Sequence, residues 1–311
     1  MTMNRSFHIP VLRKEVAEYL ITKSDGIYVD GTVGGGGHAE YILKKLDTNA
    51  TYIAIDQDIQ AIEYARKRLA HVQQIHFYHN NFNQLDVILH QLKINQIHGL
   101  LLDLGVSSFQ IDQINRGFSY LALGSPLDMR MNQSSGPTAA DLINNSETDS
   151  LVMIFKQYGE EKKARQIANI IKKVRGETPV QTTKQLREII DKVTNPRYRI
   201  KSYARIFQAL RIAINNELEN LRNILNTGTK FLAAGGRIVI ISYHSLEDRI
   251  VKNFLKSKVD PCICPHEFPQ CACGRIQELK IITRKAIKPD PAEIKRNPRS
   301  RSAIMRVGEH I

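Results

Sequence analysis

The stretch Asp30-Gly31-Thr32-Val33-Gly34-Gly35-Gly36-Gly37-His38 decides how the first part of this 311-residue chain folds. It follows an apolar run, Ile27-Tyr28-Val29, that is typical of a buried strand, and it precedes residues 39–46, which have helical spacing. A glycine cluster between a strand and a helix lets a ligand lie against bare backbone, because no side chain blocks its approach. The sequence therefore predicts a ligand-binding loop after the first strand.

A second predicted strand, residues 51–56, ends in a carboxylate. Asp56 follows Gly36 by 20 residues, the spacing at which nucleotide-binding folds place an acid on the ribose hydroxyls. The glycines also fit the relaxed dinucleotide pattern G-x-G-x-x-A, so NAD is one alternative. However, Asp30 would put a negative charge near a pyrophosphate, and His38 with four glycines forms a wider loop than the usual tight turn. A cationic sulfonium tolerates the acid better, which favours S-adenosylmethionine.

The pattern of apolar residues predicts an α/β fold with a helical insert. Strands are expected near residues 27–30, 51–56, 75–79, 97–103, 237–242, 279–287 and 302–308. Alternation of the first four strands with helices is typical of a Rossmann-like, doubly wound parallel sheet. From Thr138, a candidate helix cap, to about Val193 the period is helical, Asn195-Pro196 breaks it, and one long helix is expected over 204–226. We therefore expect the sheet domain in two parts, 1–114 and 213–311, and an all-helical insert at 115–212.

Composition and charge indicate what kind of protein this is and what kind of partner it binds. The chain is 42% hydrophobic and 24% charged, has no apolar run of membrane-spanning length, and begins without a secretory signal. With only four cysteines, these features predict a cytoplasmic globular protein. The net charge is +13, and residues 156–211 hold 15 lysines and arginines against five acidic residues. Aromatic residues lie among these cations, namely Tyr158, Tyr198, Tyr203 and Phe207, although Phe207 is also a core candidate. A polyanion, and single-stranded RNA in particular, fits this pattern.

A second basic cluster lies near the end of the chain and comprises Lys295, Arg296, Arg299, Arg301 and Arg306. Neither cluster distinguishes RNA from DNA.

Several sequence blocks together resemble one family. They are His8-Ile9-Pro10-Val11-Leu12, Asp30-Gly31-Thr32 with Gly35-Gly36-Gly37-His38, Asp103-Leu104-Gly105-Val106-Ser107-Ser108, Arg116-Gly117-Phe118-Ser119, Pro126-Leu127-Asp128-Met129-Arg130-Met131, Tyr158-Gly159-Glu160-Glu161 and Ser242-Tyr243-His244-Ser245-Leu246-Glu247-Asp248-Arg249. In this order they resemble the family of ribosomal RNA small-subunit methyltransferase H, also called MraW. The resemblance implies a class I methyltransferase fold. It also implies methyl transfer from S-adenosylmethionine to the exocyclic N4 amine of a cytidine in 16S rRNA of the small ribosomal subunit.

Site residues follow from this resemblance. It implies cofactor contacts at Gly36, Gly37, His38, Asp56, Phe82, Asp103 and Gln110. The residues support part of this set, because Asp56 can accept both ribose hydroxyls and Phe82 can pack on an adenine face, unless it is a core residue. Asp103 ends the fourth predicted strand, at the edge where such sheets bind ligands. No metal ligand is assigned to this site.

The acceptor amine needs help, because its lone pair is delocalised into the cytosine ring. A hydrogen-bond acceptor on the amine would localise the lone pair and take the proton. Many amino-methyltransferases place an Asp-Pro-Pro-Tyr-like motif after strand four, where this chain has Asp103-Leu104-Gly105-Val106. Asp103 and Ser107 are the candidates for contacting the amine, with His244 as a third. Helix capping is the alternative role for Ser107, and a structural hydrogen bond is the alternative for His244.

All four cysteines lie in Cys262-Ile263-Cys264 and Cys271-Ala272-Cys273. Two C-x-C pairs could form a four-thiolate zinc site, although the usual knuckle is C-x-x-C. A surface loop with reduced thiols is the alternative.

Two other functions are compatible with the residues alone. One is a methyltransferase of DNA or protein, and the other is a non-catalytic, RNA-binding ribosome assembly factor. The intact Gly36, Asp56 and Asp103 argue against the second. The sequence does not indicate an oligomeric state.

Overall fold

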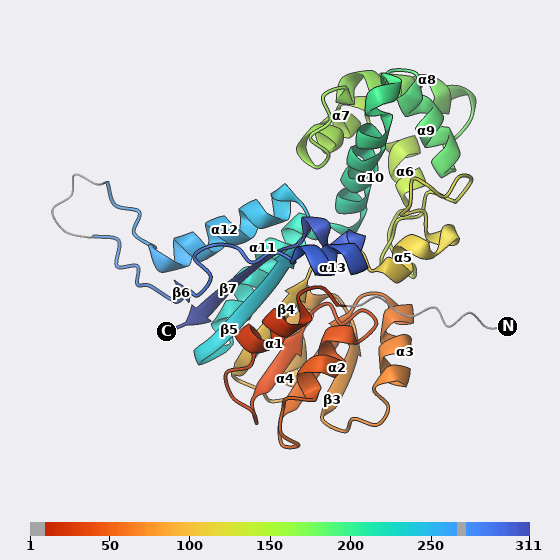
Figure 1. Ribbon diagram of the computed structural model, residues 1–311. Coiled ribbons are helices and arrows are strands. Elements are labelled where there is room, and N and C mark those ends of the chain that lie inside the picture. The colour runs from red at the N-terminus through yellow and green to blue at the C-terminus, as the bar shows by residue number, and fades with distance from the viewer. Residues whose placement is uncertain (1–9, 266–271) are drawn as a thin grey trace. The chain divides into compact units, whose positions relative to one another are not determined.

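The computed structural model describes residues 10–265 and 272–311 (Figure 1). The chain divides into two compact units: residues up to Gly105 with Leu218–Ile311 form the first, and Val106–Glu217 form the second. The second unit extends at both ends beyond the insert expected at 115–212. The backbone accounts for both ends, because Gly105 (φ 92°) and Asn216 (φ 49°) adopt left-handed conformations that interrupt regular structure.

The first unit is built on a seven-stranded sheet with the order β3-β2-β1-β4-β5-β7-β6. The strands are β1 (Ile27–Asp30), β2 (Thr51–Asp56), β3 (Ile75–His79), β4 (Ile97–Asp103), β5 (Leu232–Ser242), β6 (Leu279–Ile281) and β7 (Ile304–His310). The first five are parallel, and β7 lies antiparallel between β5 and β6. The strand order reverses between β1 and β4, which is where a doubly wound sheet binds ligands. The predicted α/β fold class is confirmed.

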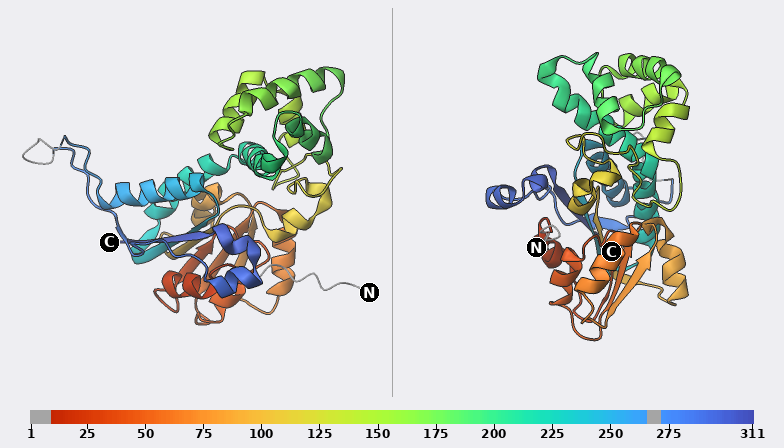
Figure 2. Two further views of the ribbon diagram at one scale, coloured as in Figure 1. Left: turned by 45° about the horizontal axis from the view of Figure 1, so that its top comes forward. Right: turned by 90° about the vertical axis from the view of Figure 1, so that its right-hand side faces the viewer.

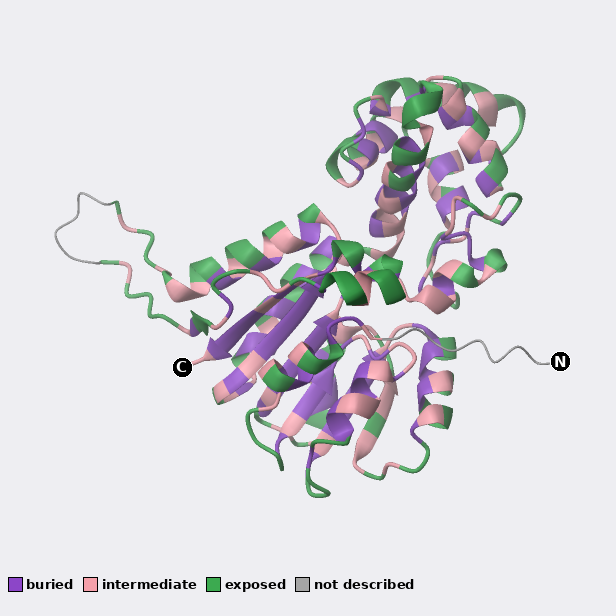
Figure 3. Cartoon of the chain, in the orientation of Figure 1, coloured by how far each residue is buried: buried purple, intermediate pink, exposed green. Residues whose placement is uncertain are grey.

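Helices cover both faces of this sheet (Figure 2). They are α1 (Arg13–Leu20), α2 (Gly37–Leu43), α3 (Ile59–Arg68), α4 (Leu85–Gln91), α11 (Glu217–Lys230) and α12 (Ser245–Val259). The short helix α13 (Pro291–Arg296) buries no residue. Neighbouring strand residues point to opposite faces. Tyr28 accordingly joins a core with residues of α1, α2 and α3, whereas Val29 joins one with residues of α4, α11 and α12. Figure 3 shows the buried central strands that result.

The second unit has its own hydrophobic core. Its helices are α5 (Ser108–Asp112), α6 (Ala139–Asn145), α7 (Thr148–Gln157), α8 (Ala164–Glu177), α9 (Thr183–Asp191) and α10 (Arg199–Asn215). Thr138 caps α6 as predicted, and Phe207 is buried. The aperiodic stretch after Arg116 also belongs to this core, since Leu127 and Met129 are buried in it. Arg116 itself is 1% exposed and donates to the carbonyls of Arg130 and Met131.

Two expectations about single elements are wrong. The helix expected over 204–226 is two helices, α10 and α11, because Asn216 breaks the helix in the left-handed region. The strand expected over 279–287 is reduced to β6 and a single bridge from Ile287 to Met305. Among the described residues, no helix is both long and apolar enough to cross a membrane.

Candidate functional site

Three carboxylates end three neighbouring strands of the first unit. Asp30 ends β1, Asp56 ends β2 and Asp103 ends β4, and both β2 and β4 pair with β1. Parallel strands bring their carboxyl ends to one edge of the sheet, so these side chains lie along the same edge. This is the edge at which the glycine-rich segment, residues 31–37, connects β1 to α2. The structure therefore places the predicted acids at a single candidate site.

Asp56 holds the glycine-rich segment through its backbone. One carboxylate oxygen accepts the Gly34 amide at 2.8 Å, and the other accepts the Asp58 amide at 2.9 Å. Burial of this carboxyl, which the two amides only partly offset, raises its pKa to about 7. A carboxylate has about four lone-pair directions. Two of them remain for a diol, which is the role predicted for Asp56.

The raised pKa has a consequence for stability. The unfolded-state value for an aspartate is near 3.9, so between about pH 4 and pH 7 the folded protein binds more protons than the unfolded chain. The contribution of Asp56 therefore makes the free energy of unfolding fall as the pH rises through that window. We expect Asp56→Asn, without added cofactor, to be more stable than the parent at pH 8 by about 1–3 kcal/mol. The difference should vanish near pH 4. Thermal melts across this range test it, and a pH-independent difference would contradict the assignment.

Asp103 is held by two other side chains of the first unit. The Tyr243 hydroxyl donates to Oδ1 of Asp103 at 2.9 Å, and Nε2 of His38 lies 3.5 Å from Oδ2. The Asp103 amide also donates to the Thr32 hydroxyl at 2.7 Å. Burial and the charge of Asp103 raise the pKa of Tyr243 well above its usual value, so this tyrosine stays a hydrogen-bond donor. The carboxylate is thereby fixed in orientation while it remains partly exposed.

His38 lies 7% exposed in the first turn of α2. Within the described part of the chain neither of its ring nitrogens makes a hydrogen bond, and the contact of Nε2 with Asp103 is an ion-pair distance of 3.5 Å. A buried polar atom without a partner is costly, so the His38 ring is suited to a bound group at this edge.

Asp30 is the most buried of the three acids, at 1% exposure. It accepts the Thr32 amide at 3.0 Å and the Tyr52 hydroxyl at 3.2 Å. Burial raises its pKa to about 6, with nearby His38 opposing that shift. Asp30 thus supplies negative potential beneath the loop, which suits a cationic ligand better than a pyrophosphate.

The glycines serve two purposes. At Gly34 (φ 50°) an added Cβ would meet only the Thr32 carbonyl, at 3.9 Å, so this position leaves the backbone bare. At Gly36 (φ 75°) a Cβ would lie 3.2 Å from Leu69, and at Gly37 it would lie 3.1 Å from Pro10. Gly36 and Gly37 therefore allow the loop to pack closely against Leu69 and Pro10. This packing role was not part of the prediction, which assigned both glycines to the cofactor surface.

Phe82 begins the short 3-10 helix η1 (Phe82–Gln84) after β3. It is half-buried and packs on the core beneath α4 and α11. A Cβ at Gly31 would lie 3.1 Å from the Cβ of Phe82, so the ring belongs to the same sheet edge as Asp56. Phe82 thus contributes to the core, which was the alternative considered for it, and it also lies where it can contact a ligand.

Ser107, Gln110 and His244 have local roles at helix starts. Ser107 and Gln110 lie in the second unit, where each accepts the other's backbone amide in a capping box on α5. His244 lies in the first unit and caps α12, with its Nε2 3.2 Å from Oε1 of Glu247. These are the alternatives considered above, namely helix capping for Ser107 and a structural hydrogen bond for His244, whose Nδ1 accepts the Glu247 amide. Their predicted contacts with an amine, and that of Gln110 with a cofactor, stay predictions.

Tyr243 was not identified from the sequence as a residue that binds Asp103, and the burial of Asp30 was not predicted. Tyr243 follows the end of β5, next to β4 in the sheet. The signal available was its position: a polar residue directly after a parallel strand lies at the ligand-binding edge.

The residues at this edge fit S-adenosylmethionine. A bare backbone segment at Gly34, a carboxylate at the end of β2 and a half-buried aromatic ring are the parts that an adenosine needs. The negative potential of Asp30 and Asp103 suits a sulfonium.

Comparison with known proteins shows the family of this chain. The MraW methylase family matches residues 5–311. Proteins named ribosomal RNA small subunit methyltransferase H are 48% identical over 305 residues in Caldicellulosiruptor saccharolyticus and 47% identical over 307 residues in Halothermothrix orenii. Each alignment covers 98% of this chain, and 99% and 98% of the respective relatives. An rRNA methylase structure from Streptococcus thermophilus aligns with 96% of this chain and 93% of its own, at 12% identity and a TM-score of 0.39. By the extent of its sequence match, this chain belongs to the MraW methylase family.

Proposed function

We propose that this protein transfers a methyl group from S-adenosylmethionine to the N4 amine of a cytidine in 16S rRNA. The observation that carries the proposal is the family match over nearly the whole chain. The site supports it, because Asp56, Asp103 and His38 occupy one edge of a doubly wound sheet. The cofactor, when bound, supplies an electrophilic methyl group. What the protein must supply is position and a partner for the amine.

Asp103 is the group suited to the amine. Its carboxylate is held by Tyr243 and His38 but keeps accessible surface. As the amine nitrogen attacks, it gains positive charge, so a fixed carboxylate beside it stabilises the transition state more than the ground state. The same carboxylate can accept the proton that the amine loses. Tyr243 is a positioning residue that fixes the direction of this carboxylate.

The second unit carries the positive charges suited to RNA, but some of these side chains are exposed and others are half-buried. Of the 15 lysines and arginines in 156–211, nine are exposed: Lys156, Lys162, Arg165, Lys172, Lys173, Lys184, Lys192, Arg197 and Lys201. The other six are half-buried and bind groups within the unit: Lys163, Arg175, Arg187, Arg199, Arg205 and Arg211. The exposed nine are the better candidates for a phosphate backbone, although Arg165 and Lys184 also contact Asp149 and Glu188.

An exposed aromatic lies among these cations. Tyr198 is 52% exposed, and the Arg197 guanidinium lies 5.8 Å from its ring centroid. Tyr203 and Phe207, in contrast, are buried. Tyr198 is therefore the ring of this set that can stack on an unpaired base, while its neighbours contact phosphates.

A binding experiment at several salt concentrations should distinguish the contribution of charge from that of base stacking. Replacing the exposed Lys172 and Lys173 by Ala should weaken rRNA binding and lower the salt slope of log K by about 1–2, because each lost phosphate contact removes about one counterion. Tyr198→Ala should weaken binding by about 1–3 kcal/mol with the salt slope unchanged. Arg175 is kept, since it donates to the Ile143 carbonyl.

The control pair removes the same charge elsewhere. Lys67 and Lys230 are exposed in the first unit, and their replacement by Ala should leave the salt slope nearer that of the parent. Fluorescence titrations at several salt concentrations measure both quantities. Equal slopes for the parent and the Lys172/Lys173 variant would mean that these charges only solvate α8.

The activity itself is tested on rRNA from a strain lacking this gene. Purified protein and labelled S-adenosylmethionine should methylate its 16S rRNA, either free or in small subunits, and nucleoside mass spectrometry should identify N4-methylcytidine. Methylation of DNA or protein instead would support the alternative substrates. Cofactor binding without any transfer would support an assembly factor.

A further inference from the structure

The connection from α12 to β6 is a long loop with a fastened base. Residues 260–278 contain no helix or strand in their described part. At the base, Nζ of Lys258 lies 2.6 and 2.7 Å from the two carboxylate oxygens of Glu278, and the Glu278 amide donates to the Lys258 carbonyl at 3.0 Å. Loops of this length without secondary structure are uncommon, and functional loops are one of their two usual classes, beside linkers.

The described residues above that base have no apolar core. None of the described residues in 261–265 and 272–277 is buried, and Ile263 and Ile276 are 65% and 77% exposed. Short segments that cannot bury apolar surface are usually stabilised by a covalent or metal cross-link.

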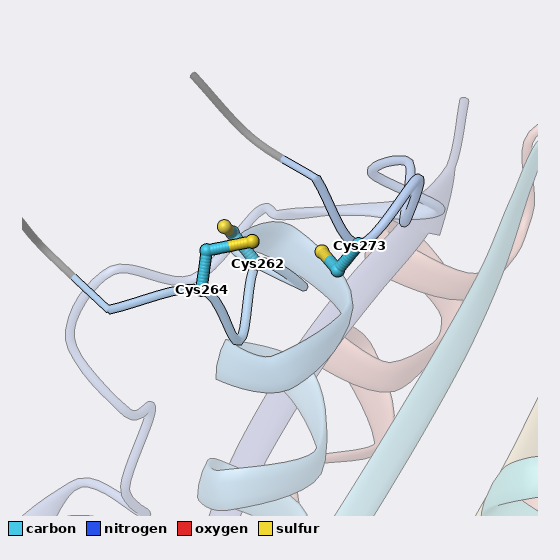
Figure 4. A group of neighbouring side chains, drawn as sticks. All are labelled: Cys262, Cys264 and Cys273. Atoms are coloured by element: carbon cyan, nitrogen blue, oxygen red, sulfur yellow. The ribbon is translucent and has the colours of Figure 1, made fainter. Parts of the chain in front are cut away.

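Three cysteine side chains converge in this loop. The Sγ atoms of Cys262, Cys264 and Cys273 all lie within 4.8 Å of one another, and Figure 4 shows them pointing toward a common space. Zinc bound tetrahedrally with Zn–S bonds of about 2.3 Å needs sulfur–sulfur separations of about 3.8 Å. The sulfurs therefore reach coordination distance through side-chain adjustments of about 1 Å.

One backbone amide already contacts a cysteine sulfur. The Ala272 amide donates to Sγ of Cys264 at 3.3 Å. Such a contact stabilises a thiolate and orients it toward a metal. Gly274, in the left-handed region (φ 64°), turns the chain directly after Cys273.

We propose that Cys262, Cys264 and Cys273 bind a structural Zn²⁺ that ties residues 262–264 to residue 273. Thiolates are soft ligands that select zinc over magnesium or calcium. On binding, each thiol releases its proton to solvent and contributes an electron pair to the metal, with no change of oxidation state. A structural zinc has four ligands. Cys271 lies outside the described residues, and its substitution decides whether it is the fourth.

The test measures metal in the full-length chain. Protein expressed with zinc and purified under reducing conditions without chelator should contain about one zinc per chain by elemental analysis. Cys262→Ser, Cys264→Ser and Cys273→Ser should each lose most of it. Ile263→Ser is the matched control: it changes an exposed residue between two ligands and should retain the metal. Cobalt(II) substitution should give thiolate charge-transfer absorption in the parent and the control only.

A second measurement reports on the loop rather than on the metal. Removing zinc with a chelator should make the loop sensitive to limited proteolysis between residues 260 and 278, and readding zinc should restore protection. Zinc below about 0.1 equivalents in the parent, or undiminished zinc in the three serine variants, would overturn the proposal. Iron with sulfide in place of zinc, or a disulfide found by alkylation mapping, would overturn it as well.

Discussion

Asp103→Asn should reduce kcat by roughly 100-fold or more, the scale of a positioned acid–base group. The substitution keeps the size of the side chain and removes the charge that would face the amine. The carboxylate is held at the end of β4 by the Tyr243 hydroxyl, 2.9 Å away, and by His38. A charge fixed in this way requires little reorganisation as the nitrogen becomes positive, which is why its removal should affect turnover more than RNA binding.

The measurement is single-turnover methylation at saturating cofactor, because Asp103 is also a predicted cofactor contact. Asp86→Asn, which alters a carboxylate in the first turn of α4, is the matched control and should retain normal turnover. Tyr243→Phe should show a smaller loss in kcat at saturating cofactor, about 10-fold, as expected for one hydrogen bond to a charged group. Near-normal methylation by Asp103→Asn would exclude the catalytic role and move it to Ser107 or His244.

Asp56→Ala should weaken S-adenosylmethionine binding by about 1.5–3 kcal/mol, or about 10- to 150-fold. The carboxylate can take two charge-assisted hydrogen bonds from the ribose while it holds the Gly34 amide. Because burial raises its pKa to about 7, the affinity of the parent should also rise as the pH increases through 7. That pH dependence should be lost in the variant.

Calorimetry between pH 6 and pH 8 measures both effects. Glu63→Ala removes an exposed carboxylate from α3 in the same unit, and should change neither the affinity nor its pH dependence. An unchanged affinity in folded Asp56→Ala would show that the ribose is bound elsewhere.

The sheet was predictable because its signals are local. Apolar runs ending in Asp30, Asp56 and Asp103 indicate parallel strands with acids at one edge, and the structure has them there. The glycine segment after β1 and the cap at Thr138 were equally readable. Each depends on the backbone preferences of a few consecutive residues.

The helix break at Asn216 and the burial of Leu127 and Met129 were not predictable in this way. Both depend on packing between residues far apart in the chain. Asn215, for example, donates to the Met129 carbonyl and accepts the Met131 amide. No periodicity in the sequence signals such a contact.

The basic side chains also show which properties are local and which depend on the tertiary structure. The sequence alone determined that residues 156–211 are strongly basic, and that Arg306 belongs to a second basic cluster. Only the tertiary structure decided which charges face solvent: Arg175 binds the Ile143 carbonyl, Arg187 binds the Tyr120 carbonyl, and Arg306 pairs with Asp248. An arginine has the same charge in either place, so composition cannot distinguish a phosphate ligand from an internal tie. The long-range fold makes that distinction, because it brings acceptors from distant segments within hydrogen-bond distance.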